Sequence, residues 1–145
     1  MENTQENLKK NKIKLDFKDS KYATGRRKRS IAKVWVKKGT GNIHVNGLKM
    51  NEYFKRPVHQ IIVTRPLEIS EVASNYDVKC SVKGGGLSGQ AGAIILGISK
   101  ALISYDETLK KNLKKDKLTT RDSRVVERKK YGHKKARRSF QFSKR

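Results

Sequence analysis

The most enzyme-like feature of the sequence is a glycine-rich run, Gly84-Gly85-Gly86-Leu87-Ser88-Gly89. A glycine loop that enters a helix presents backbone N–H groups and the positive end of the helix dipole, and both attract phosphate. The run fits G-x-x-x-x-G, but Gln90 and Ala91 follow where a nucleotide-binding P-loop requires Lys and then Ser or Thr. Three interpretations stay open: a tight strand-to-helix turn, a kinase-like loop of another type, or a turn that also cradles an RNA phosphate. The residues of such a cradle would be Gly84, Gly85, Gly86, Gly89 and Gln90.

Side chains suited to acid–base, metal or thiol chemistry are few. The central acids have no spacing typical of a paired catalytic site. They are Glu52, Glu68, Glu71 and Asp77. We expect His44 on the polar face of a strand, His59 in a helix and His133 in a basic tail, so that no two share metal-ligand spacing. Cys80 alternates with valines and is expected to be a small core residue. We therefore expect no catalytic residue, no metal and no cofactor.

Positive charge dominates the composition. Lys and Arg number 36 and Asp and Glu number 13, which gives a net charge of +23. Residues 21–42 hold eight cations and no acid, and residues 121–145 hold 11 cations and two acids. Such stretches repel each other unless a polyanion neutralises them. The predicted partner is a nucleic acid, and neither a membrane nor a small-molecule substrate is expected.

The two basic blocks supply the candidate RNA-binding residues. In the first, four successive cations run into a strand, and on an extended segment they would point to both sides and bridge separate phosphate strands. A solubilising strand end is the alternative. In the second, cations are interleaved with aromatic rings that can stack on bases, as in a tail that orders on RNA. The candidates are Arg26, Arg27, Lys28, Arg29 and Lys33, then Arg121, Arg124, Arg128, Lys129, Lys130, Tyr131, His133, Lys134, Lys135, Arg137 and Arg138.

The hydrophobic pattern predicts the elements that hold these residues. Alternating apolar residues predict strands over 30–38 and 76–83, and a glycine loop at 39–41 suggests that 30–38 forms a hairpin with 42–47. Asn46-Gly47 predicts a second turn. A helix is expected within 52–64, ending before Pro66, because the residue before a proline disfavours helix.

A second helix follows the glycine loop. Ala91, Ile94, Ile95, Ile98, Leu102 and Tyr105 have helical spacing and form one apolar face. Gly92 and Gly97 would let this helix lie close to a sheet, and residues 107–115 suggest a lysine-rich helix. The fold class indicated is an α/β two-layer sandwich with a long extended basic C-terminal tail.

The apolar residues also suggest how the chain is divided. Of the 34 Leu, Ile, Val and Phe residues, 23 lie within residues 31–105. We expect a polar extension over 1–20, a compact domain over 21–120 and a tail over 121–145. The sequence has no uninterrupted run of about 18 apolar residues, so it does not predict a membrane span. The acids near Met1 argue against a secretion signal or transit peptide, and a single cysteine suits a reducing compartment.

Several motifs together resemble a known family. They are Tyr22-Ala23-Thr24-Gly25-Arg26-Arg27-Lys28, the loop and helix of residues 84–102, residues 118–132, and the ending Gln141-Phe142-Ser143-Lys144-Arg145. In this combination the chain resembles the bacterial form of the ninth protein of the small ribosomal subunit, over about residues 21–145. The resemblance implies a left-handed βαβ arrangement, shared with galactokinase and homoserine kinase type enzymes, which accounts for the phosphate-loop appearance.

The resemblance also implies a function. Members of that family are structural proteins of the small-subunit head and are not enzymes. They bind ribosomal RNA through basic blocks, and their tails reach peptidyl-site tRNA. Carried over, Ser143, Lys144 and Arg145 would contact the tRNA, neighbouring ribosomal proteins of the head would be partners, and the location would be a bacterial cytoplasm rather than an organelle.

This sequence departs from the family pattern at three places. Ser139 and Phe140 replace an Arg-Pro pair, Lys100 stands where Arg is common, and residues 1–20 have no counterpart. Two other classes of function remain open from the residues alone. A general nucleic-acid chaperone or nucleoid protein would share the charge, and a small phosphate-binding kinase would use the glycine loop.

Overall fold

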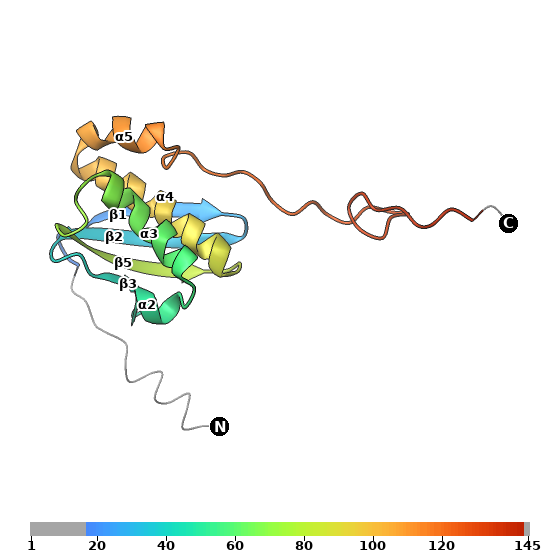
Figure 1. The fold of residues 1–145 in the computed structure, drawn as a ribbon, viewed down its shortest axis with the longest axis horizontal. Coiled ribbons are helices and arrows are strands. Elements are labelled where there is room, and N and C mark those ends of the chain that lie inside the picture. Colours follow the sequence, from blue (N-terminus) through green and yellow to red (C-terminus); the bar gives the residue numbers. More distant parts are fainter. Residues whose placement is uncertain (1–16, 144–145) are drawn as a thin grey trace, which may run out of the picture.

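The fold is a five-stranded mixed sheet with helices packed on one of its faces, followed by a long tail (Figure 1). The structure is a computed structural model that describes residues 17–143. The strands are β1 (Lys21–Arg27), β2 (Ser30–Lys38), β3 (Ile43–Val45), β4 (Leu48–Lys49) and β5 (Tyr76–Lys83). The helices are α2 (Met50–Tyr53), α3 (Pro57–Ile69), α4 (Leu87–Tyr105), the 3-10 turn η1 (Glu107–Leu109) and α5 (Lys110–Lys115). The expected α/β two-layer sandwich is confirmed.

The sheet has the order β1-β2-β5-β3-β4. Strands β2 and β5 pair antiparallel along their whole length, from Ile31 opposite Lys83 to Lys38 opposite Tyr76. Their alternation matches the prediction, because Val34 and Val36 of β2 and Val78 of β5 are fully buried. These side chains face α4 and α3, which supply much of the rest of the core. Its largest fully buried members include Phe54, Val63, Ile94, Ile98 and Leu102.

The strand pairing corrects the predicted hairpin between residues 30–38 and 42–47. Strand β2 pairs with β1 and β5, and β5 separates it from β3, which runs parallel to β5. The loop of residues 39–41 therefore crosses the end of β5 and does not turn the chain back to pair with β2. The hairpin partner of β2 is β1, a strand that the sequence analysis did not predict. The second turn is confirmed, since Asn46 and Gly47 adopt φ of 52° and 85° between β3 and β4.

One further expectation was wrong. Helix α3 does not end before Pro66 but continues to Ile69, with Pro66 buried in its last turn. Packing on the core there offsets the one hydrogen bond that a proline cannot donate.

His44 lies on the polar face of its strand, as expected, because it aligns with Lys79 of β5 and Lys49 of β4. Its neighbours on both sides cover it, so only 9% of its surface is accessible.

Helix α4 lies very close to the sheet, as its glycines predict. A Cβ on Gly97 would stand 2.5 Å from Cγ2 of Val34, and one on Gly25 of β1 would collide with the carbonyl oxygen of Ala93. By length and composition, α4 is the one helix among the described residues that could span a membrane, with a mean hydropathy of 1.3. Because 61% of that stretch is buried inside the fold, these are the properties of a core helix.

We predict that Gly25→Ala destabilises the protein by about 1–3 kcal/mol, because the added methyl forces β1 and α4 apart. Urea unfolding followed by circular dichroism measures the change. Gly86→Ala is the matched control, since a Cβ there meets nothing within 4 Å and the residue has an ordinary φ of −110°. Equal loss of stability in both variants would contradict the close approach.

Candidate nucleic-acid interface

The first basic block forms the closed end of the β1–β2 hairpin. Arg27 pairs with Ser30, so Lys28 and Arg29 make a two-residue turn. Lys28 has a φ of 51°, a conformation that is uncommon for a residue other than glycine. The prediction of four cations on one extended segment is therefore wrong for the last two. Arg26, Lys28 and Arg29 are exposed, whereas Arg27 is half-buried.

The glycine loop packs directly beneath this turn. The Ser30 hydroxyl donates a hydrogen bond to the carbonyl oxygen of Gly84 at 3.0 Å. A Cβ on Gly84 would lie 2.6 Å from the carbonyl oxygen of Arg29, and one on Gly85 would collide with the Ser30 hydroxyl. Gly84 and Gly85 also adopt positive φ, of 74° and 65°. The tight-turn interpretation is confirmed, and the glycines let the basic turn approach the loop backbone.

The remaining residues of the glycine loop make structural contacts within the fold. Gly86 precedes α4 as its N-cap, Gly89 lies in the first turn near Ser30, and the Gln90 side chain donates to the Gly84 carbonyl at 3.2 Å. His59 of α3 contacts the Ser88 hydroxyl of the same turn, with its Nε2 3.0 Å from the oxygen. A phosphate contact by this loop stays a prediction.

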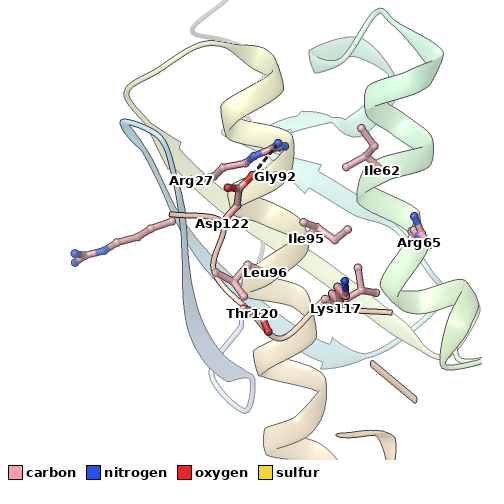
Figure 2. A pocket seen from close by; sticks show the side chains of 11 residues that line it. Arg27, Ile62, Arg65, Gly92, Ile95, Leu96, Lys117, Thr120 and Asp122 are labelled. Atoms are coloured by element: carbon pink, nitrogen blue, oxygen red, sulfur yellow. Dashed lines mark ion pairs between the residues drawn. The ribbon is translucent and has the colours of Figure 1, made fainter. Parts of the chain in front are cut away.

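Arg27 ties the basic hairpin to the start of the tail (Figure 2). Its guanidinium lies 3.3 Å from the Asp122 carboxylate. Its side chain also crosses α4 at Gly92, where a Cβ would collide with it. A side chain on residue 92 would therefore displace Arg27. The sequence analysis placed Arg27 among residues free to bind phosphate, and it gave no sign of this tie, because the two partners lie 95 positions apart.

Asp122 is held by a second arginine as well. Arg124 donates to it from its backbone N–H at 3.1 Å and from two guanidinium nitrogens at 3.0 Å and 2.9 Å. These hydrogen bonds, together with the charges of Arg124 and Arg27, hold the pKa of the Asp122 carboxyl well below its usual range. One carboxylate thus pairs with two of the predicted phosphate-binding arginines and offsets one of their two positive charges. We call Arg27, Asp122 and Arg124 the tail anchor.

A hollow of about 240 Å³ opens beside the tail anchor, between β1, α3, α4 and the segment before the tail (Figure 2). Its floor is apolar, with Ile62 and Ile95, and four cations line it. Two of them, Arg26 and Arg27, were predicted as site residues. Arg65 and Lys117 were not, since they come from separate elements and no spacing in the sequence relates them to the basic blocks. Arg65 is also 3.6 Å from Asp116.

The tail beyond the anchor extends away from the sheet and helices (Figure 1). Its predicted contact residues are exposed, apart from His133, which is half-buried. Tyr131 is 94% exposed and Phe142 is 81% exposed, so both rings are available for stacking. The exposed cations are Arg121, Arg124, Arg128, Lys129, Lys130, Lys134, Lys135, Arg137 and Arg138. Ser143 is exposed too, whereas Lys144 and Arg145 lie outside the described residues.

The tail is not extended throughout, because residues 133–139 close on themselves. The Lys134 N–H donates to the Arg138 carbonyl at 2.7 Å, and the Ser139 hydroxyl lies 3.2 Å from Nδ1 of His133. Just outside, Phe140 packs under the Lys134 ammonium at 5.5 Å. We call residues 133–139 the tail loop. Ser139 and Phe140, two of the residues that depart from the expected pattern, both help to close it.

The other candidate chemical groups have structural partners. Cys80 is buried, and burial raises the pKa of its thiol, so it is an unreactive core residue as expected. Within residues 17–143, no group of three or more His, Cys, Asp or Glu side chains could hold a metal ion. Lys33 is exposed on the sheet face opposite the helices.

The comparison with known families points to one of them. A family model described as ribosomal protein S9/S16 matches residues 25–145. The match includes the turn of the basic hairpin, the glycine loop, the tail anchor and the whole tail.

We predict that Asp122→Asn releases the start of the tail. The backbone amide of Arg124 should then exchange with solvent faster, because the uncharged amide oxygen of Asn accepts more weakly and the ion pairs with Arg27 and Arg124 are lost. Hydrogen exchange followed by NMR measures the rate. Asp116→Asn is the matched control, since Asp116 pairs with Arg65 and not with Arg27 or Arg124. Unchanged exchange at Arg124 would contradict the tail anchor.

The same contact predicts a pH dependence. A carboxylate whose pKa is lowered by folding stabilises the structure above its unfolded pKa and loses that effect only as pH falls through the folded pKa. The Asp122 carboxyl signal should therefore show no inflection in an NMR titration between about pH 7 and pH 3, the range within which an ordinary aspartate, with a pKa of about 4, passes its midpoint. An inflection near pH 4 would show that the carboxylate is not paired.

Proposed function

The chain belongs to the ribosomal protein S9/S16 family, and we propose that it works in the head of the small subunit. Membership of this family makes it a structural, ribosome-associated protein that binds ribosomal RNA and contacts neighbouring ribosomal proteins. In the head, its tail would contact peptidyl-site tRNA during translation. We further propose a bacterial cytoplasmic ribosome as its location. The observation that carries this proposal is a compact core whose basic hairpin is tied to the start of a long cationic tail.

The proposal assigns a separate role to each part of the chain. Residues 21–120 would dock on folded RNA, with Arg26, Lys28 and Arg29 of the hairpin against phosphates. Residues 121–145 would follow the RNA outward, and residues 1–20 are a polar extension with no assigned role. Phosphate contacts should outnumber base contacts, because exposed Lys and Arg side chains recognise the backbone.

The tail anchor explains how such a tail could keep a direction. Ion pairs from Asp122 to both Arg27 and Arg124 fix the point where the chain leaves the core. The nine cations of residues 128–145 then meet RNA beyond that point. If all nine met phosphates, the logarithm of the binding constant would fall with that of the salt concentration with a slope of roughly −6 to −8.

Two other functions fit these observations less well. A nucleoid protein or general chaperone needs the charge but has no need of a tail held at a fixed exit. A small kinase would use the space at the glycine loop, which the Ser30 side chain and the Arg29 backbone occupy. The absence of any stabilisation by Mg-nucleotide in a thermal melt would count against the kinase.

We predict that the protein sediments with small subunits, whole ribosomes and polysomes in a sucrose gradient of a native lysate. The peaks should survive a high-salt wash, because many simultaneous contacts hold an integral component. A spread through the light fractions, or loss at modest salt, would instead identify a loosely bound basic protein.

We predict that deleting residues 143–145 weakens tRNA binding to the peptidyl site and leaves subunit assembly intact. The deletion removes two cations from the tail end and no residue of the core. Filter binding of tRNA to purified small subunits measures the effect. Lys114→Gln with Lys115→Gln on α5 is the charge-matched control. Normal tRNA affinity in truncated subunits would exclude the tail end from tRNA contact.

A further inference from the structure

The sheet face opposite α3 and α4 is a second surface with the chemistry of RNA binding. Residues on β1, β2 and β5 alternate between the core and this face, and the register aligns the outward ones in rows. One row runs from Tyr22 through Trp35 to Lys79, and the next runs from Thr24 through Lys33 to Ser81. A third runs from Arg26 through Ile31 to Lys83. We call this surface the outer sheet face.

Aromatic rings gather at one end of the outer sheet face. The rings of Tyr22 and Trp35 are cross-strand neighbours with centroids 5.3 Å apart, and Tyr22 is 49% exposed. The Lys79 ammonium lies 6.0 Å from the Trp35 ring centroid and 5.7 Å from that of Phe17. Because the helices cover the other face, these rings contribute nothing to the main core.

Cations continue from the aromatic end along the same face. Lys33 and then Lys83, with Arg26, are exposed one and two rows away. Successive outward residues of a strand are about 7 Å apart, so the rings and cations cover a strip roughly 14 Å long. Among the described residues, the one acid aligned with these rows is Asp77, which accepts hydrogen bonds from the Thr40 and Asn42 backbone N–H groups at 3.0 Å and 2.8 Å. The strip is therefore cationic.

We propose that the outer sheet face binds a single-stranded segment of RNA, with a base stacked on the Tyr22 ring beside Trp35 and phosphates held by Lys33 and Lys83. Aromatic rings on an open sheet are suited to unpaired bases, because a duplex keeps its bases stacked on one another. An acidic protein would satisfy the cations but would leave the exposed ring of Tyr22 without a planar partner. The inference rests on the proposed function and assigns it a surface separate from the hairpin turn and the tail.

Trp35 is the chain's single tryptophan, so its fluorescence reports on this face alone. The full chain is titrated with a single-stranded RNA of about ten nucleotides, the duplex of that sequence and linear polyphosphate. Stacking of a base should quench the emission with the single strand, whereas polyphosphate, which has charge but no bases, should leave it unchanged. The duplex should bind without quenching, through the hairpin and the tail.

Two pairs of substitutions test the cations. Lys33→Gln with Lys83→Gln should weaken the quenching titration at least fivefold and reduce its salt slope by about 1.4, since each cation on single strands contributes roughly 0.7. Lys110→Gln with Lys111→Gln, which removes the same charge from α5, should leave the titration unchanged. Tyr22→Leu should weaken the quenching and keep the fold, because Leu fills the same apolar edge.

Three results would overturn the inference. The single strand could bind by fluorescence anisotropy without changing Trp35 emission, polyphosphate could quench equally, or the Lys33 and Lys83 pair could bind as the unsubstituted chain does. None of these results touches the proposed function. That function fails separately, when the protein is missing from small subunits in the sucrose gradient.

Discussion

The contact between β1 and α4 at Gly25 is the constraint on which the basic surface depends. With no side chain at Gly25, the strand backbone reaches the Ala93 carbonyl, and the whole hairpin is drawn onto the helix. The hairpin turn then rests on the glycine loop, and Arg27 lies across α4 at Gly92. From that position Arg27 meets Asp122 and so sets where the tail begins. Small residues in the core thus determine the placement of distant charges.

Much of the fold was predictable because burial leaves a periodic signal. Alternation identified β2 and β5, and helical spacing identified α4, since Val34, Val78 and Ile94 each face one core. The neighbour of each strand was not predictable, because alternation says which face a residue takes and nothing about which strand lies beside it. Strand β5 enters between β2 and β3 from far along the chain. Strand β1 was missed as well, because its cations obscured the pattern that predicts a strand.

The candidate site was predictable in composition and not in geometry. The charge runs correctly indicated exposed cations in the hairpin turn and along the tail. They could not reveal that Asp122 forms ion pairs with Arg27 and Arg124, because an ion pair depends on where the side chains lie in space. Glu127 similarly takes up Arg137 at 3.0 Å. Both acids of the tail therefore shape its path, although a charge count treats them as small corrections to a polycation.

The tail loop shortens the tail. Seven residues drawn straight would span about 23 Å, whereas the bridge between His133 and Ser139 holds their ends side by side, so roughly 20 Å of contour is folded away. A modest set of polar contacts and one ring–cation contact closes it. With the loop closed, the chain between His133 and Ser139 therefore advances far less than its residue count allows. Any change that broke these contacts would lengthen the path from the tail anchor to Phe140 by that amount.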